Sequence, residues 1–220
     1  MKYSKNAKPR TRVPGSERKR IILAQALELF ADRGFHGVSV DEIASASGIT
    51  KPVLYDHFSS KQDLYIQVSR EIRERLLARG RDVIQPPRSL AERIRTGVEA
   101  FFVFAEQNPA AIRILLSPAK DEKKLYRAIQ AVQDEATAST MKMLLAAGLR
   151  IPNNQAGTSR LRLQVEFIKQ GLHALAEWRT YHAATPRDLV VDAISQLIRA
   201  GLLAKGYEHG PIEIAETYQL

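Results

Sequence analysis

The sequence predicts an all-α fold, and three observations support it. Apolar residues recur at the three- and four-residue spacing of helices along most of the 220 residues. Candidate helix starts carry serine, threonine or asparagine, whose side chains accept hydrogen bonds from the first unpaired N–H groups of a helix. The best candidate for a strand, Val38 to Val40, is too short to build a sheet. Together these patterns predict about nine helices and no sheet.

The first predicted helix runs from about Glu17 to Arg33 and has Ser16 as its cap. Its apolar face consists of Ile22, Ala26, Leu29 and Phe30. Gly34 ends it, because glycine tolerates the left-handed backbone that commonly closes a helix. Three capping boxes, in which a serine and a residue three positions on satisfy each other's backbone N–H groups, indicate further starts. They are Ser39 with Glu42, Ser59 with Gln62, and Ser89 with Glu92.

Two later helices are marked by a proline that follows Asn108 and a proline that follows Thr185. The missing N–H of proline costs nothing at the first position of a helix. A long helix that starts near Lys61 contains the expected domain boundary. We therefore divide the chain into a basic arm (1–15), a three-helix domain (16–62), a larger helical domain (63–206) and a C-terminal tail (207–220).

Residues 39–58 have the parts of two short helices that cross at a tight turn. Ile43 and Ala44 face inward, and the small Ala44 lets the second helix approach closely. Gly48 supplies the turn, where a positive φ would strain other residues. Leu54 and Phe58, four residues apart, bury one stripe of the second helix. The pattern predicts that the N-terminal domain is a helix-turn-helix.

A helix-turn-helix reads DNA by placing the start of its second helix in the major groove. Thr50 and Lys51 can donate there to phosphates or guanine edges, and Val53 offers methyl groups to a thymine methyl. The Tyr55 hydroxyl, the His57 imidazole and the Lys61 ammonium can donate to phosphates. The residues predicted to contact DNA are Ser39, Thr50, Lys51, Pro52, Val53, Tyr55, His57 and Lys61.

The formal net charge of +9 is concentrated at the start of the chain, where residues 1–20 hold eight basic residues and one acidic residue. Such an arm is typical of a disordered polycation that meets nucleic acid, and a solubilising tail is the alternative. Used alone, it would make the chain a non-specific, architectural nucleic-acid-binding protein. The carboxylate of Asp56 would be repelled by nearby phosphates. Two explanations for it stay open: it pairs with a basic neighbour, or it accepts a hydrogen bond from a cytosine amino group.

Several spaced motifs make residues 16–68 closely resemble the TetR family of bacterial regulators. They are Arg20-Ile-Ile-Leu-Ala through Leu29-Phe-Ala-Asp-Arg-Gly-Phe35, then Ser39-Val-Asp-Glu-Ile-Ala44, then Leu54-Tyr-Asp-His-Phe-Ser-Ser-Lys61 with Leu64. The chain departs from the family at Lys51-Pro52-Val53, where many members carry a glycine and a threonine. The bases that it reads therefore cannot be copied from a relative.

The resemblance implies a sequence-specific homodimer that binds double-stranded DNA at a palindromic operator, in the cytoplasm and at the nucleoid of a bacterium. It also implies that the larger domain encloses a small-molecule effector and forms the dimer. Release of a repressor by its effector is the mode that the resemblance mainly implies, and activation is the alternative.

The residues of the segment from Thr158 to Trp178 support a dimer independently, because they form two apolar stripes at helical spacing. The first stripe is Leu161, Val165, Ile168, Leu172 and Leu175; the second is Leu163, Phe167, Gln170, Gly171, Ala174 and Trp178. A helix that is apolar on two sides is buried on two sides. We assign the first stripe to the partner subunit, joined by Val190, Ile194, Leu197 and Gly201 of the last helix. The alternative is a helix wholly inside its own domain.

Candidates for an effector pocket come from aromatic, methionine and amide side chains of the larger domain. They are Phe101, Phe104, Tyr126, Met141, Met143, Phe167, Gln170 and Trp178. Aromatic and methionine residues at helical spacing also build ordinary cores, which is the alternative for each of them.

The sequence has no cysteine, which excludes disulfides, thiol catalysis and thiolate metal sites and suits a reducing cytoplasm. It has no HExxH motif and no glycine-rich dinucleotide loop, and Gly201 to Gly206 shares only its glycine spacing with a P-loop. We therefore expect no enzyme, no cofactor and no metal. The longest apolar run, Ala100 to Ala105, is far shorter than the about 20 residues that cross a bilayer. The basic start lacks the apolar run of a signal peptide.

Overall fold

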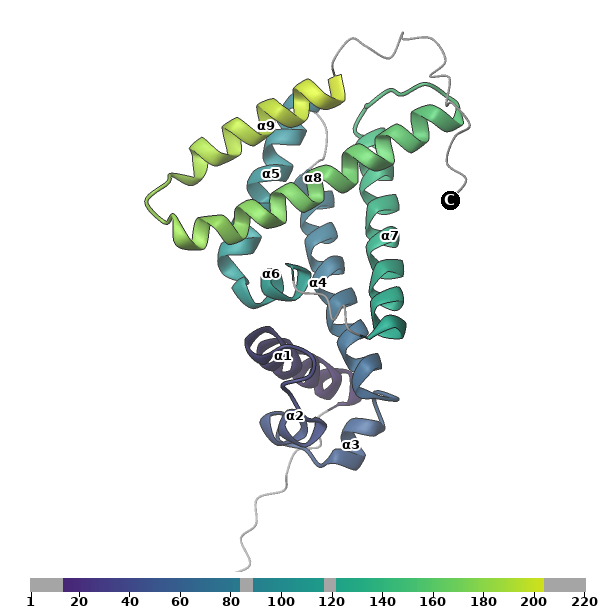
Figure 1. Cartoon of the computed structure of the whole chain (residues 1–220), viewed down its shortest axis with the longest axis vertical. Coiled ribbons are helices and arrows are strands. Elements are labelled where there is room, and N and C mark those ends of the chain that lie inside the picture. Colours follow the sequence, from purple (N-terminus) through teal and green to yellow (C-terminus); the bar gives the residue numbers. More distant parts are fainter. Residues whose placement is uncertain (1–13, 84–88, 117–121, 204–220) are drawn as a thin grey trace, which may run out of the picture.

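The computed structural model describes residues 14–83, 89–116 and 122–203, and within these ranges the chain forms nine helices and no strand (Figure 1). They are α1 (Gly15–Arg33), α2 (Val40–Ala46), α3 (Lys51–Tyr55), α4 (Lys61–Val83), α5 (Leu90–Gln107), α6 (Pro109–Leu116), α7 (Lys123–Ala146), α8 (Gln155–Tyr181) and α9 (Arg187–Leu203). The all-α prediction is confirmed. Nearly all of the predicted basic arm and the whole predicted C-terminal tail lie outside the described residues. No helix in these ranges is long and apolar enough to cross a membrane.

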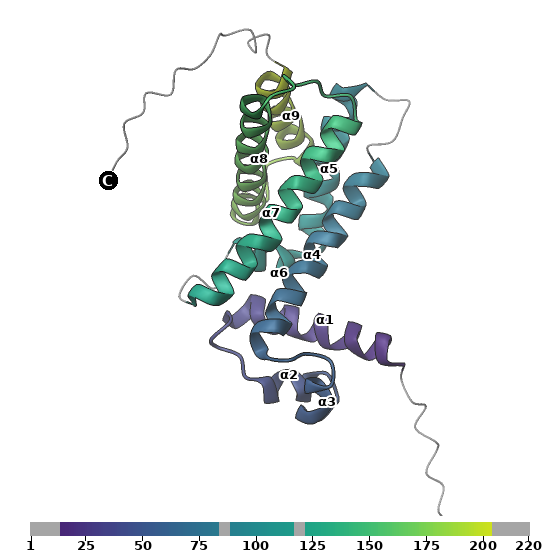
Figure 2. The same cartoon turned by 90° about the vertical axis from the view of Figure 1, so that its right-hand side faces the viewer.

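Helix α4 connects the two ends of the molecule (Figure 1, Figure 2). Helices α1, α2 and α3 form one end, and α4 begins beside them and continues into a bundle with α5 to α9. Along its length α4 packs against α1, α5 and α7, while α6 of the bundle packs against α1. The three-helix domain is therefore joined to the bundle by packed helices.

Two of the predicted capping boxes are present and fix the starts of α2 and α5. The Ser39 hydroxyl accepts from the Glu42 N–H at 3.2 Å, and the Ser39 N–H donates to the Glu42 carboxylate at 2.7 Å. The Ser89 hydroxyl accepts from the Glu92 N–H at 3.3 Å, and the Ser89 N–H donates back at 2.7 Å. Each box satisfies two backbone donors that the helix itself leaves unpaired.

The third predicted box is wrong by one residue. Ser60 and Asp63 cap α4 in place of Ser59 and Gln62: the Asp63 N–H donates to Ser60 Oγ at 3.0 Å. The Ser59 N–H donates to Asp63 Oδ2 at 2.9 Å. Two successive serines leave the register open in the sequence, and the ionised carboxylate of Asp63 is a stronger acceptor than the amide of Gln62.

Helix α1 begins earlier than the sequence predicts. It starts at Gly15 with Pro14 at the capping position, so Ser16 lies inside the first turn rather than at its cap. Its end is as predicted, because Gly34 adopts a φ of 70° and its N–H donates to Phe30 O at 2.9 Å. Glycine adopts this positive φ without strain, so the helix can end here.

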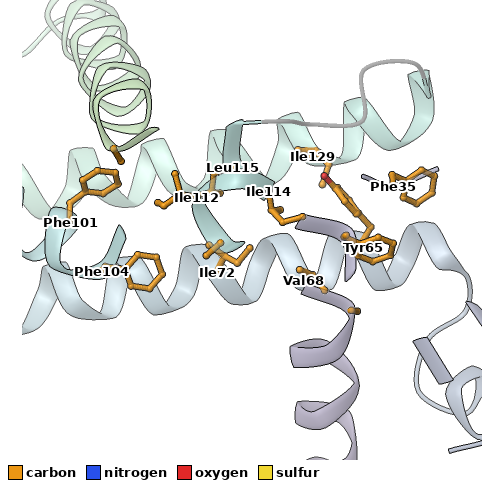
Figure 3. Packing of buried hydrophobic residues seen from close by; sticks show 14 of the residues in the cluster. Phe35, Tyr65, Val68, Ile72, Phe101, Phe104, Ile112, Ile114, Leu115 and Ile129 are labelled. Atoms are coloured by element: carbon orange, nitrogen blue, oxygen red, sulfur yellow. The ribbon is translucent and has the colours of Figure 1, made fainter. Parts of the chain in front are cut away.

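One continuous hydrophobic core runs from the three-helix end into the bundle (Figure 3). At the three-helix end, the Tyr65 ring of α4 lies 5.1 Å from Phe30 and 5.4 Å from Phe35, measured between ring centres. Ile72 and Phe104 extend the same row of buried side chains into the bundle. Because protein cores are close-packed, a shift of α4 must move side chains at both ends.

Candidate nucleic-acid interface and ligand cavity

The turn between α2 and α3 has the geometry that the sequence predicts. Gly48 adopts a φ of 67°, and the Ile49 N–H donates to Ala44 O at 3.0 Å, which closes the turn. The side chains that face inward from the two helices are buried; they are Ile43, Ala44, Leu54 and Phe58. This confirms the helix-turn-helix, in which one face of α3 is held by apolar packing and the opposite face is outside.

The outer face of α3 is polar and exposed. The exposed residues are Thr50, Lys51, Pro52 and Tyr55, while Val53 and His57 are half-buried. Thr50 occupies the capping position of α3 without a side-chain capping bond, so its hydroxyl can turn to another acceptor. Six of the eight predicted DNA contacts thus lie together on and beside this short helix. Their contact with DNA stays a prediction.

An ion pair across the turn holds Lys51. Its Nζ lies 2.9 Å from Oδ2 of Asp41 in the first turn of α2. The hydrogen bond from Lys51 to Asp41 raises the pKa of Lys51, so the ammonium stays charged. Both side chains are exposed, and water and salt weaken such a pair. Lys51 can therefore exchange Asp41 for a phosphate or a base edge. Asp56, the acidic residue at the other end of α3, is exposed at its C-cap.

Ser39 and Lys61 make contacts within the protein. The Glu42 carboxylate that completes the Ser39 box also accepts from Arg33 of α1 at 2.7 Å. The Ser39 backbone N–H, together with the Arg33 guanidinium, lowers the pKa of Glu42 to about 2. The Lys61 ammonium lies 4.4 Å from the centre of the Phe35 ring, and partial burial lowers its pKa. Ser39 and Lys61 thus brace the starts of α2 and α4, and their DNA contacts stay predictions.

A cavity of about 190 Å³ lies inside the bundle between α4, α5, α7, α8 and α9. Most of its wall is apolar and includes Leu76, Val98, Phe101, Met143, Val165 and Leu172. Its volume far exceeds the roughly 10–15 Å³ that holds one water molecule, so several ligand atoms fit inside. Concave sites with apolar walls and a few placed polar groups are typical of small-molecule binding.

Of the residues predicted for an effector pocket, Phe101 and Met143 line this cavity. Phe104 is buried elsewhere in the core, beneath the guanidinium groups of Arg75 and Arg79. The remaining candidates do not line it; they are Tyr126, Met141, Phe167, Gln170 and Trp178. Phe167 and Trp178 are in fact 81% and 40% exposed. The structure does not bring the predicted set together, because helical spacing defines a face without showing whether that face meets a cavity or the surface.

Several polar side chains that were not predicted to line a pocket line the cavity, among them Arg73, Lys169 and His173. Arg73 is 6% exposed, and its Nε has no hydrogen-bond partner. Lys169 donates to the Thr137 hydroxyl and lies 3.2 Å from the Glu166 carboxylate. Burial, aided by the positive charges of Arg73 and Lys169, lowers the pKa of His173 to about 4. The imidazole is therefore neutral at neutral pH.

A second hollow, of about 350 Å³, is a groove between α8 and α9, which lie side by side on one flank of the bundle (Figure 1). Large apolar side chains border it and are exposed: Phe167 by 81%, Leu163 by 71% and Leu197 by 68%. A Cβ added to Gly171 or Gly201 would meet no atom within 4 Å, so the backbone is open to approach. Exposed apolar patches are a common feature of protein interaction sites, and the role of this groove in a dimer stays a prediction.

The two stripes of α8 divide between core and surface differently from the prediction. Leu161 and Val165 of the first stripe, and Val190 of α9, are buried in the chain's own core and offer no surface to a partner. This side of α8 turns inward because α5, α6 and α7 cover it. Leu163 and Phe167 of the second stripe border the groove instead. The other proposed interface residues also line it, namely Ile168, Leu172, Leu175, Ile194, Leu197 and Gly201.

Comparison with known sequences places the similarity at the three-helix end. Residues 22–68 match the model of bacterial regulatory proteins of the tetR family. The chain is 40% identical over 104 residues to the HTH-type transcriptional activator FasR of Mycolicibacterium smegmatis. The aligned region covers 47% of this chain and 48% of that protein. It is 38% identical over 87 residues to the HTH-type transcriptional regulator RutR of Escherichia coli, covering 38% and 41%. The chain thus matches about half the length of these relatives or less.

Comparison with solved structures extends over most of the fold. A TetR-like transcriptional regulator from Rhodococcus sp. RHA1 superposes with a TM-score of 0.66 at 25% identity, covering 88% of this chain and 100% of that one. The regulator FadR of Bacillus subtilis, solved in complex with stearoyl-CoA, superposes with a TM-score of 0.68 at 15% identity, covering 83% and 98%. The second likeness is one of fold alone.

Proposed function

Because the chain belongs to the TetR family of transcriptional regulators, we propose that it acts as a homodimer on a palindromic DNA operator and responds to a small molecule in its cavity. The observation that carries this proposal is the outer face of α3. Thr50, Lys51 and Tyr55 are exposed together on a helix whose other face is locked into the core. A helix presented in this way fits the major groove.

The α8–α9 groove supports the dimer. Phe167, Leu163 and Leu197 expose apolar surface that a second copy of the same face would cover. A two-fold interface uses the same patch on both subunits, so a single exposed groove suffices to build it. The pair of α3 helices would then read two half-sites about 34 Å apart, or a multiple of that distance.

The packing of the helices supports a coupling between cavity and DNA. Helix α4 lines the cavity with Arg73, Leu76 and Gly80, and its first residue, Lys61, follows α3 closely in the chain. From α6, Arg113 Nε donates to Ala31 O of α1 at 3.1 Å. A ligand that prefers one position of α4 shifts the population of α3 arrangements, and DNA must alter ligand affinity by the same factor.

An apolar ligand is supported by the cavity walls and by the acyl-CoA that the Bacillus subtilis regulator of the same fold holds. On a promoter, the bound dimer represses transcription and the ligand relieves that repression.

Selection of DNA fragments from a random pool by the purified full chain tests the proposal. We expect a two-fold symmetric consensus whose half-sites are separated by whole turns of the double helix. Equal recovery of unrelated sequences would instead identify a non-specific, architectural nucleic-acid-binding protein. Binding to single half-sites without symmetry would contradict the dimer.

A further inference from the structure

We infer that the cavity takes a free carboxylic acid with a long apolar chain, and that Arg73 is the residue that pairs with its carboxylate. The inference deepens the proposed function, on which it rests for the role of the cavity as a ligand site. Arg73 is a buried cation whose Nε has no hydrogen-bond partner in the protein.

Arg73 lines the cavity and is 6% exposed, yet its Nε has no hydrogen-bond partner. Within the described residues it forms no ion pair with any carboxylate. A guanidinium carries five N–H donors and stays charged, and burial of such a group is costly unless it is paired. Burial lowers the pKa of Arg73 only to about 10, so the charge persists at neutral pH. A ligand anion would supply the missing partner.

The other charged groups near the cavity leave Arg73 without a paired carboxylate, so one ligand anion can pair with it. Lys169 and Glu166 lie 3.2 Å apart and compensate each other, and the buried His173 is neutral. Two other arginines of the wall are half-buried and donate to neutral oxygens of the protein: Arg79 to Gln107 at 2.9 Å, and Arg93 through one terminal nitrogen to Ala147 O at 3.0 Å, while its Nε also lacks a partner. Arg73 differs from both because it is buried, 6% exposed, and forms no ion pair within the described residues, where Glu166 acts on it only electrostatically.

The rest of the wall selects an apolar chain. Along α4 the cavity extends from Arg73 to Gly80, seven residues or about 10 Å of helix. Met143 of α7 lies beside Gly80, and Leu144 of α7 and Leu90 and Ile94 of α5 also line the cavity; none of these side chains offers a donor or an acceptor for strong hydrogen bonds. A purely apolar ligand would leave Arg73 unpaired, and a polar one would lose its hydration against this wall. An apolar chain that ends in one anion satisfies both.

The charge of Arg73 also distinguishes a free acid from its coenzyme A thioester. A thioester carbonyl is neutral and can accept a hydrogen bond but brings no charge to Arg73. A carboxylate accepts two parallel N–H bonds from a guanidinium, which is the stronger pairing. The buried position of Arg73 therefore favours the free acid.

The test uses the full-length protein, free of DNA, and three probes of equal chain length: dodecanoate, dodecan-1-ol and dodecanoyl-coenzyme A. Calorimetric titration gives each dissociation constant for the wild type and for Arg73→Met, which keeps an apolar chain and removes the charge. We expect the wild type to bind dodecanoate about tenfold or more tightly than dodecanol, since charged hydrogen bonds in a buried site are strong. Arg73→Met should lose this preference while its affinity for dodecanol stays the same or rises.

Two control variants keep the result interpretable. Arg79→Met removes a wall arginine that already has a partner and should keep the preference for dodecanoate. Arg73→Lys keeps a positive charge and should retain part of the preference for dodecanoate. Because Arg73→Met replaces an unpaired buried charge by an apolar side chain, its melting temperature should not fall.

The inference is overturned if dodecanol binds the wild type as tightly as dodecanoate, or if no probe binds. It is also overturned if Arg73→Met keeps the preference, or if dodecanoyl-coenzyme A binds more tightly than the free acid. These readouts need no DNA. A protein that prefers dodecanoate but selects no DNA consensus would therefore contradict the proposed function and leave the ligand assignment standing.

Discussion

Replacing Phe167 by glutamate should separate the proposed dimer. The side chain is 81% exposed at the α8–α9 groove, so nearly all of its apolar area is available for burial by a partner. Full burial of a phenylalanine contributes about 1.5 to 3 kcal/mol, and a two-fold interface buries two copies. The loss of about 3 to 6 kcal/mol corresponds to a dissociation constant weaker by about two to four orders of magnitude. The added carboxylates only increase this loss.

Sedimentation velocity at micromolar protein concentration measures the effect directly. Wild type and the control Phe167→Leu, which keeps an apolar side chain, should sediment as dimers, and Phe167→Glu as a monomer with an unchanged helical circular dichroism spectrum. The monomer should also lose most of its affinity for a two-half-site operator. A Phe167→Glu protein that sediments like the wild type, or a wild type that is monomeric, would refute the assignment of this groove to the dimer.

Three further predictions concern stability, pH and charge. Ser39→Ala removes the capping box of α2 and should lower the free energy of unfolding in urea by about 1 kcal/mol; an unchanged midpoint would contradict the role of the box. Because the pKa of His173 is lowered from 6.5 to about 4, the unfolded chain takes up a proton first as the pH falls through this window. Stability should therefore decline from pH 6.5 to pH 4, by up to about 3 kcal/mol more than in His173→Gln, and parallel denaturation curves would contradict the burial of a neutral imidazole. Asp41→Asn frees Lys51 and removes a negative charge, so fluorescence anisotropy should show tighter binding to DNA of any sequence, and weaker binding would contradict this.

The N-terminal domain could be predicted almost completely because its signals are local. The box of Ser39 and Glu42, the left-handed Gly48 and the spacing of Leu54 and Phe58 each fix a nearby piece of backbone or one helix face. The start of α1 was predicted too late, and a second error occurred where a local signal was duplicated. At Ser59 and Ser60 either serine could cap α4, and the contact with Asp63 decided between them.

The bundle was less predictable because its faces depend on partners far away in the chain. Both stripes of α8 are apolar, and periodicity cannot show that Leu161 turns toward the core while Phe167 turns outward. Arg73 was not predicted to line a cavity because arginine side chains are usually solvent-exposed. A signal was nevertheless present, since Leu76 and Leu77, three and four residues further on, lie on the same helical face as Arg73. A charged residue within such a stripe is a candidate for burial at a site.

The proposed function depends above all on recognition of a DNA sequence by the outer face of α3. The direct measurement is the binding of wild type and Lys51→Ala to the selected operator and to a scrambled duplex of the same length, at several salt concentrations. We predict that Lys51→Ala loses about ten- to a hundredfold more affinity on the operator than on the scrambled duplex, as expected for a contact to a base. Tyr55→Phe should weaken both about equally, as expected for a phosphate contact. Equal wild-type affinity for the two duplexes, or no effect of either substitution on any DNA, would contradict the claim.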